Sequence, residues 1–216
     1  MSTLSKILEK KIIAIIRGAN PKDVLNIASA LYEGGIGILE ITMNSPGAES
    51  AIELLSKKMG DLLLIGAGTV LDPSTAKLAI SLGAKFIISP NTDPATIEMT
   101  KDHGAISIPG AFTPNEIHTA FRAGGEIIKV FPAILGPGYI REILAPLPRI
   151  PLMPTGGINL QNIRAFLDAG AVAFGIGNSL YDRSKLITEE YLVQLKCNAG
   201  KFVAALAGSE IGQPLN

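Results

Sequence analysis

Short apolar segments alternate with amphipathic segments along the chain, and the alternation repeats eight times in 216 residues. Apolar strands that are covered by helices on both faces form a parallel sheet. Eight such units favour a closed (β/α)8 barrel over an open doubly wound sheet. We therefore predict an α/β fold of the TIM-barrel class, with strands over residues 12–16, 37–42, 62–66, 86–89, 105–108, 127–131, 152–154 and 171–175.

Helical patterns separate these strands, and several begin with proline or Asx signals and end on glycine. A short amphipathic stretch over residues 4–9 is predicted to form an N-terminal helix that caps the bottom of the barrel. A C-terminal helix over residues 188–207 would close the ring, with Cys197 packed in it. Because no interdomain linker is visible, we expect one domain over residues 1–216. Other predicted helices cover residues 21–33, 73–82, 114–123 and 160–169.

Composition limits the class of protein. Hydrophobic residues make up 47% of the chain, which is enough for one sizeable core. Lys plus Arg and Asp plus Glu both number 19, so the charge balance argues against a nucleic-acid or membrane partner. No apolar run approaches the roughly 18 residues that span a bilayer. The single cysteine fits a reducing compartment, so we expect a cytoplasmic protein.

One lysine, Lys129, interrupts the apolar strand predicted over residues 127–131. An unpaired buried ammonium is costly, and desolvation lowers the pKa of a buried lysine until it sheds its proton. A neutral amine attacks carbonyl carbon, which makes Lys129 a candidate Schiff-base nucleophile. An edge strand with Lys129 facing water explains this segment equally well, so the segment alone does not decide between the two.

Glu40 interrupts the second predicted strand in the same way. Inside a barrel, side chains from alternate strands form layers, so inward side chains of strands two and six belong to the same layers and face each other across the axis. Glu40 and Lys129 can therefore meet as a catalytic pair in the half of the barrel where ligands bind. A buried structural salt bridge is the alternative.

Other polar residues follow the predicted strands at the end where barrel active sites lie. A guanidinium suits a substrate carboxylate, so Arg17 is a candidate anchor, with a solvated loop charge as the alternative. Thr69 is a further candidate, although threonine also serves as a helix cap. Pro90 and Thr155 follow the fourth and seventh strands.

Two glycine-rich loops follow strands seven and eight, at residues 155–158 and 175–179. Glycine lets backbone N–H groups approach a ligand closely, and these two loops hold phosphate in many barrels. Together they predict a phosphorylated substrate, although either loop alone is an ordinary turn. Residues 66–68 lack the third glycine of a dinucleotide loop and fit a tight turn after strand three. No metal site is expected, because His103 and His118 fall on predicted helices without ligand-spaced partners.

Seven stretches of the chain carry a family resemblance, and they cover residues 14–17, 39–42, 66–70, 88–90, 128–133, 154–158 and 177–179. Together they resemble the KDPG/KHG aldolase family (2-keto-3-deoxy-6-phosphogluconate and 4-hydroxy-2-oxoglutarate aldolases). The stretches occur in the family's order, and the lysine and threonine-glycine-glycine motifs are the specific ones.

The resemblance implies a class I, metal-independent aldolase that needs no cofactor and is commonly a homotrimer. Lys129 would form an iminium with a 2-keto group, and Glu40 would act as general acid and base. Thr155 would touch the hydroxyls that decide stereochemistry. The substrate-binding positions would be Arg17, Thr69, Pro90, Phe131, Thr155, Gly156, Gly157, Gly177, Asn178 and Ser179, with Gly156, Gly157 and Ser179 on the phosphate.

One position departs from the family pattern. Many members carry an arginine for the pyruvate carboxylate directly before the Ser/Thr-Pro that follows strand two, where this chain has Asn44-Ser45-Pro46. The same tripeptide resembles members that act on the galactonate epimer. Carboxylate binding would then fall to Arg17.

We therefore predict cleavage of 2-keto-3-deoxy-6-phosphogluconate to pyruvate and glyceraldehyde 3-phosphate. The galactonate epimer is the alternative main substrate, and cleavage of 4-hydroxy-2-oxoglutarate to pyruvate and glyoxylate stays open. Two rival functions also stay open. One is an isomerase on the same scaffold in which Lys129 is only electrostatic, and the other is a non-catalytic sugar-phosphate sensor.

Overall fold

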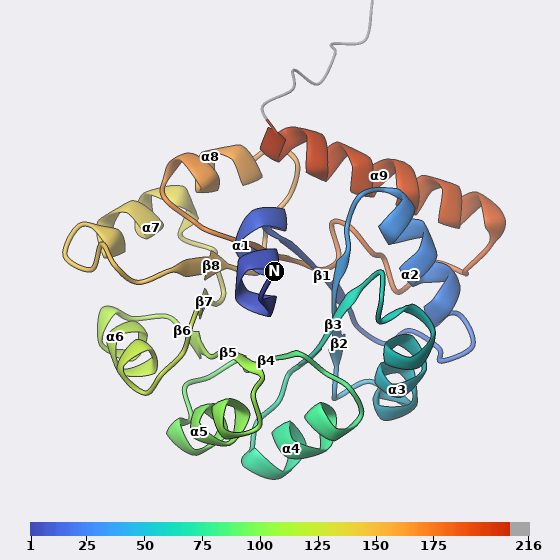
Figure 1. Ribbon diagram of the computed structural model, residues 1–216. Helices are drawn as coiled ribbons and strands as arrows, with labels where there is room; N and C mark the ends of the chain where they lie inside the picture. The colour runs from blue at the N-terminus through green and yellow to red at the C-terminus, as the bar shows by residue number, and fades with distance from the viewer. Residues whose placement is uncertain (208–216) are drawn as a thin grey trace, which may run out of the picture.

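The computed structural model describes residues 1–207, so the last part of the predicted domain, residues 208–216, lies outside the described residues. The strands are β1 Ile12–Ile16, β2 Ile38–Thr42, β3 Leu64–Gly68, β4 Phe86–Ile88, β5 Ile106–Ile108, β6 Gly110–Ala111, β7 Ile128–Val130, β8 Leu152–Pro154 and β9 Phe174–Ile176. The helices are α1 Thr3–Lys10, α2 Val24–Glu33, α3 Ala48–Met59, α4 Pro73–Ser81, α5 Pro94–Asp102, α6 Pro114–Arg122, α7 Gly136–Leu144, α8 Ile163–Asp168 and α9 Glu189–Ala207. Helices α2 to α9 surround the strands, and α1 lies over their middle (Figure 1).

The strand pairs are parallel and form two groups. Six strands pair in the order β5-β4-β3-β2-β1-β9, and three pair in the order β6-β7-β8. Only Pro109 separates β5 from β6 along the chain. Between β8 and β9, the Val172 N–H donates to the Leu152 carbonyl at 3.0 Å, and Thr155 forms a parallel bridge with Gly175. The prediction of an α/β fold with a parallel, curled sheet is confirmed.

Hydrophobic clusters lie on both sides of the strands. The larger cluster fills the space between the strands and the outer helices, and the smaller one, on the inner side, includes Ile13, Ile38 and Ile127. Ile7 of α1 is fully buried in the smaller cluster, which confirms that the N-terminal helix caps one end of the strands. Side chains alternate along a strand, so positions two residues further on face the same interior, nearer the carboxyl ends.

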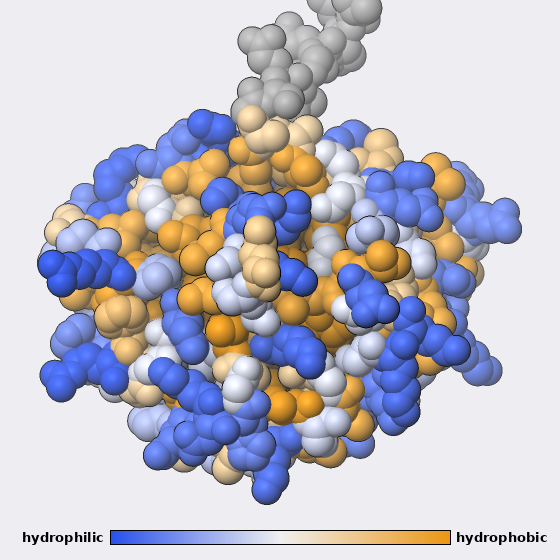
Figure 2. Space-filling model, viewed as in Figure 1, coloured by the Kyte–Doolittle hydropathy of each residue, from blue (hydrophilic) through white to orange (hydrophobic). Residues whose placement is uncertain are grey.

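The outer helices present a hydrated surface. On the face shown in Figure 2, hydrophilic side chains lie mainly around the rim, and apolar residues are visible between them and around α1. This distribution follows from the amphipathic helical patterns of the sequence, because each helix turns one face toward the strands.

Several helix starts agree with the sequence signals, and two differ. Helix α6 begins at a capping box formed by Thr113 and Glu116. Helices α2 and α8 begin three residues later than predicted. Asn20 and Asn159 each accept a hydrogen bond from a backbone N–H two residues further along, at 3.0 and 2.9 Å. Such Asx turns compete with helix formation, which delays both helices.

The third strand lies two residues further along than predicted, because β3 begins at Leu64 and Leu62 is 55% exposed. Gly66 and Gly68 therefore lie inside β3, and the interpretation of these glycines as a tight turn is wrong. A Cβ atom on Gly68 would collide with the carboxylate of Glu40, and one on Gly66 would collide with the ring of Phe86. The two glycines make room for side chains of the neighbouring strands.

Two further predictions need correction at the C-terminal end. The sequence predicts the last strand over residues 171–175, whereas β9 covers Phe174–Ile176. Cys197 is exposed, so the prediction that it packs within the C-terminal helix is wrong. It lies between buried Leu195 and Ala199 on α9, on the side of the helix that faces water.

Candidate active site

A cavity of about 460 Å³ opens at the carboxyl ends of the strands. All the predicted site residues except Glu40 line it. These are Arg17, Thr69, Pro90, Lys129, Phe131, Thr155, Gly156, Gly157, Gly177, Asn178 and Ser179. The sequence prediction missed Ile15, Ile158, Asn159, Gly175 and Tyr181, which also line it. For Ile15, the signal was its position two residues before Arg17 on the same strand face.

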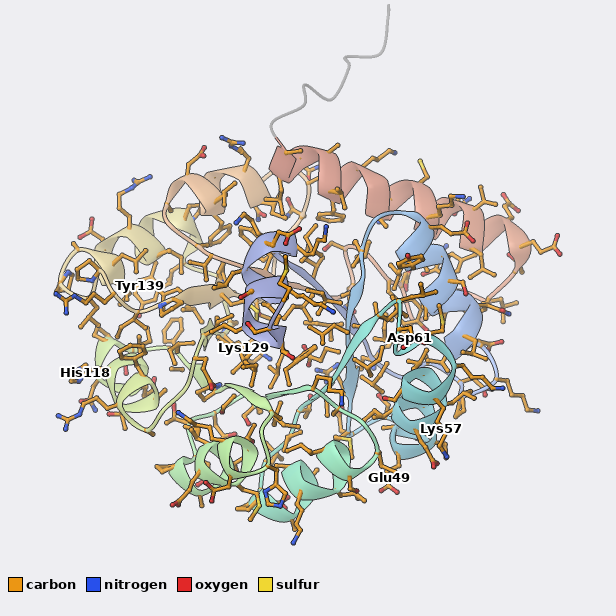
Figure 3. The ribbon with its side chains drawn as sticks, in the orientation of Figure 1. Glu49, Lys57, Asp61, His118, Lys129 and Tyr139 are labelled. Atoms are coloured by element: carbon orange, nitrogen blue, oxygen red, sulfur yellow. The ribbon has the colours of Figure 1, made fainter. Side chains whose placement is uncertain are left out.

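Lys129 lies in the interior and not at a sheet edge. Strand β7 is paired on both sides, with β6 and with β8, and the Lys129 side chain is 5% exposed. Lys129 follows Ile127 of the inner cluster by two positions, so it points to the same interior. Figure 3 shows it within the ring of strands, whereas Lys57 lies on the outside. The alternative of an edge strand with a solvated lysine is wrong.

Electrostatics around Lys129 favour the neutral amine. Burial lowers the pKa of Lys129 from its usual value, the Glu40 carboxylate opposes this shift, and the Arg17 guanidinium adds to it. A neutral amine carries the lone pair that attack on a carbonyl carbon requires. The ring of Phe131 lies 5.0 Å from the Lys129 Nζ, close enough to stabilise a cation when one forms.

Glu40 is buried below the cavity without a polar partner. It is 1% exposed, and neither carboxylate oxygen has a hydrogen-bond partner within the described part of the chain. The ion pairs found among residues 1–207 do not include one between Glu40 and Lys129, so the structural salt bridge is absent. Burial raises the pKa of Glu40, and the charges of Lys129 and Arg17 only partly offset this. Glu40 is therefore suited to hold and release a proton.

Arg17 supplies positive charge to the cavity wall. Its side chain is half-buried, and its Nη2 donates to the Thr69 Oγ1 at 3.5 Å. Thr69 has a positive φ of 55°, and the N-cap of the following helix is Asp72, so Thr69 is not that helix cap. The alternative of a solvated Arg17 stays a prediction that Arg17→Ala kinetics can test. Asn44 is exposed and does not line the cavity, which leaves Arg17 as the cation nearest to Lys129 on this wall.

The glycine loops present backbone donors to the cavity. Gly156 and Gly157 have positive φ values of 89° and 81°. The backbone N–H groups of Gly157, Ile158, Asn178 and Ser179 donate to no other group among the described residues. The Ser179 hydroxyl donates to the Ile158 carbonyl at 2.5 Å, which joins the two loops. Free N–H groups converging from two loops form a site for an anion.

Thr155 has a hydroxyl that is free to meet a ligand. Its side chain is 4% exposed, and its Oγ1 has no hydrogen-bond partner among residues 1–207. Gly175 on β9 leaves the space that this hydroxyl occupies, because a Cβ atom there would collide with Oγ1. A buried hydroxyl without a partner is costly, and a bound ligand hydroxyl would satisfy it.

The two histidines lie on the surface, and His118 projects from α6 away from the strands (Figure 3). Within residues 1–207, no group of three His, Cys, Asp or Glu side chains could hold a metal ion. Among the described helices, none is long and apolar enough to cross a membrane.

Sequence comparison identifies similar proteins. A sequence model for the family described as KDPG and KHG aldolase matches residues 4–196. The probable 2-dehydro-3-deoxy-6-phosphogalactonate aldolase of Rhizobium meliloti is 38% identical over 176 residues, which are 81% of this chain and 83% of the relative. The 2-dehydro-3-deoxy-phosphogluconate aldolase of Haemophilus influenzae is 36% identical over 186 residues, which are 85% of this chain and 87% of the relative.

Comparison with solved structures also identifies similar proteins. A solved structure described as native KDPGal has a TM-score of 0.85 at 32% identity, over 92% of this chain and 95% of the other. KDPG aldolase from Legionella pneumophila, with pyruvate captured at low pH as a covalent carbinolamine intermediate, has a TM-score of 0.77 at 29% identity, over 91% and 93% of the two chains. The similarity extends over nearly the whole fold.

The raised pKa of Glu40 predicts a gain in stability when its charge is removed. The native state keeps this proton at pH values at which the unfolded chain has lost it, so the carboxyl's contribution to stability is complete below pH 4.5 and lost as the pH rises through the raised pKa. Glu40→Gln stays neutral, so its urea midpoint should exceed that of the wild type at about pH 8, with a difference that shrinks toward about pH 4.

The matched control is Glu98→Gln, which changes an exposed carboxylate on α5. Its midpoint should follow that of the wild type within a few tenths of a kcal/mol at both pH values. An equal or lower midpoint of Glu40→Gln at the higher pH would mean that the Glu40 carboxylate stabilises the fold.

Proposed function

We propose that this chain, which belongs to the KDPG and KHG aldolase family, cleaves a 2-keto-3-deoxy-6-phospho sugar acid. Membership of this family confirms the sequence prediction of an aldolase, and hence of a lyase. The products would be pyruvate and glyceraldehyde 3-phosphate. The observation that carries this proposal is the buried, unpaired Lys129 at the base of a cavity lined by anion-binding groups. The covalent carbinolamine of the Legionella relative supports Schiff-base chemistry.

In this proposal Lys129 begins the reaction. Its neutral Nζ attacks the C2 carbonyl carbon, and the carbinolamine that forms takes a proton from the Glu40 carboxyl as it loses water, which gives an iminium on Lys129 and leaves Glu40 as a carboxylate. The C3–C4 bond then breaks, and its electron pair flows into the iminium to give an enamine on Lys129. Protonation of the enamine at C3 and hydrolysis of the resulting iminium release pyruvate and restore the amine.

Glu40 is the proposed proton carrier for bond cleavage. The C4 hydroxyl must lose its proton as the aldehyde forms, and Glu40 would receive this proton directly or through a water molecule. Its two oxygens are free of other partners, so no hydrogen bond has to break first. Positioned acid–base catalysis of this kind is worth about 10²–10⁴-fold, so Glu40→Gln should lose activity on that scale.

The rest of the cavity would hold the two ends of the substrate. Arg17 and Thr69 would bind the carboxylate next to Lys129, with Pro90 and Phe131 against the three-carbon unit. The loops with Gly156, Gly157, Gly177, Asn178 and Ser179 would bind the phosphate through their backbone N–H groups.

The galactonate epimer is a second candidate substrate. Asn44-Ser45-Pro46 and the 38% identical relative named for 6-phosphogalactonate favour it, while the relative named for phosphogluconate is 36% identical. The two epimers differ in the configuration of a single hydroxyl group. The buried Thr155 hydroxyl has no other partner among the described residues and would distinguish the epimers by a hydrogen bond to that group. Initial rates with the two epimers side by side decide which is preferred.

Four further assignments, on the fold, the domain, the assembly and the location, complete the proposal. The hydrogen bonds between β8 and β9 and the short Pro109 connection support a complete (β/α)8 barrel. The absence of an interdomain linker from the sequence supports one domain over residues 1–216. The family resemblance implies a homotrimer, in which exposed Ile134 and Leu135 would be available for contact between copies, and light scattering would detect it as three times 22.6 kDa. The lone exposed Cys197 fits a cytoplasmic location, which cell fractionation can test.

Trapping of the iminium tests the proposed function. Borohydride reduces an iminium, so treatment with pyruvate should add one three-carbon unit, and peptide mapping should find it on Lys129. Lys129→Arg should be inactive and untrapped, because a guanidinium cannot form the iminium. The control Lys57→Arg changes an exposed lysine on α3 and should be trapped like the wild type.

Each rival function predicts a different result. An isomerase in which Lys129 is electrostatic would turn over sugar phosphates without any adduct, and a sensor would bind them without turnover. An adduct on another lysine would contradict the role of Lys129.

Arg17→Ala tests the carboxylate anchor. A charge-assisted hydrogen bond lost from such a site costs on the order of 1.5–3 kcal/mol, which predicts about a 10- to 160-fold rise in KM for pyruvate in the condensation direction. The KM for glyceraldehyde 3-phosphate should change much less. A larger effect on the phosphorylated aldehyde would show that Arg17 reaches the phosphate instead.

A further inference from the structure

Asn198 lies on α9 outside the cavity but contacts the loop that follows β9. Its Nδ2 donates to the Ser179 carbonyl at 3.0 Å and lies 3.4 Å from the Leu180 carbonyl. These residues separate the active-site cavity from a surface groove of about 360 Å³ that Asn198 lines. The amide of Asn198 therefore binds the outer side of a loop whose inner side faces the cavity.

The loop between Gly177 and Leu180 is a turn. The N–H groups of Leu180 and Tyr181 both donate to the Gly177 carbonyl, at 2.9 and 3.0 Å. This closure leaves the N–H groups of Asn178 and Ser179 without an acceptor among the described residues. A peptide C=O and the N–H of the next residue point in opposite directions, so holding the Ser179 and Leu180 carbonyls outward turns the Leu180 and Tyr181 N–H groups toward the Gly177 carbonyl. The Asn198 amide thereby supports the closed turn, in which the Asn178 and Ser179 N–H groups have no acceptor among the described residues.

Helix α9 packs closely against α2. Gly34 at the end of α2 allows α9 to approach so closely that a Cβ atom there would meet the Ala199 side chain at 2.5 Å. Lys196 also forms an ion pair with Glu33 at 2.8 Å. Asn198 is half-buried and lies between Lys196 and Ala199 in the sequence of α9, so these two contacts hold the part of the helix that carries its amide.

We propose that Asn198 is a positioning residue for the phosphate end of the substrate, acting through the carbonyls of Ser179 and Leu180. This inference rests on the proposed function, because it assumes that the 177–179 turn binds phosphate. Without the amide, the turn would rotate or fluctuate, and the Asn178 and Ser179 N–H groups would no longer converge on the anion. Lys129 and Glu40 lie on other strands and would be unaffected.

The test replaces Asn198 by leucine, which has a similar volume and cannot donate a hydrogen bond. Asn198→Leu should raise the KM for glyceraldehyde 3-phosphate about 5- to 10-fold, the effect of losing one or two neutral hydrogen bonds. The exchange of pyruvate methyl protons with D₂O needs only the iminium and enamine on Lys129. Its rate, followed by NMR, should stay within about twofold of the wild type, since the phosphate loops take no part.

The matched control is Gln194→Leu. Gln194 lies one turn earlier on the same face of α9, lines the same groove and is exposed, and its side chain makes no hydrogen bond with another described residue. This variant should change neither the KM for the phosphorylated aldehyde nor the exchange rate. If Asn198→Leu does not fold, Asn198→Ala removes the same donor from a helix position that tolerates alanine.

The outcomes separate this inference from the proposed function. An unchanged KM for glyceraldehyde 3-phosphate, or equal losses in KM and in proton exchange, would overturn the positioning role. If the wild type shows no aldol turnover, the proposed function fails, and calorimetry with inorganic phosphate decides the positioning role. Weaker phosphate binding by Asn198→Leu than by Gln194→Leu would support it, and equal or absent binding would overturn it.

Discussion

The burial of two ionisable side chains without an ion pair between them is the constraint on which the candidate site depends. Lys129 and Glu40 are 5% and 1% exposed, and Glu40 has no hydrogen-bond partner among the described residues. Removing such groups from water costs several kcal/mol each when no partner compensates. The cost is smallest when the amine is neutral and the acid is protonated. A neutral amine can attack a carbonyl carbon, and a protonated carboxyl can give its proton to the carbinolamine and then accept the C4 hydroxyl proton as a carboxylate. The surrounding fold must supply the stability that this arrangement loses.

Close packing of the strands supplies this stability, and glycines at particular positions make room for the polar side chains. Gly68 on β3 leaves the volume that the Glu40 carboxyl occupies, and Gly175 on β9 does the same for the Thr155 hydroxyl. The inner cluster with Ile7 of α1 seals the opposite end of the strands. The cavity with Lys129 lies toward the carboxyl ends of the strands, where the glycine loops leave backbone N–H groups free for an anion.

Much of this was predictable because it repeats locally in the sequence. The alternation of strands and helices predicted the parallel α/β fold, and Lys129 and Glu40 were visible as lone charges in apolar strands. The register of β3 was not predictable, because Gly66 and Gly68 look like a turn in the sequence. Only the structure shows that the Phe86 ring and the Glu40 carboxylate occupy the space beside these two glycines. The contact of Asn198 with the 177–179 turn was also invisible, since it depends on how α9 packs in three dimensions.

The most direct test of this account is the pKa of Lys129 itself. In protein labelled with ¹³C at the lysine Cε, NMR titration should show one lysine that loses its proton well below the usual value of about 10.4, and Lys129→Arg should remove that signal. In Glu40→Gln the pKa should fall further, because the opposing carboxylate is gone. If every lysine titrates near its usual value, Lys129 is a charged structural residue and the account is contradicted.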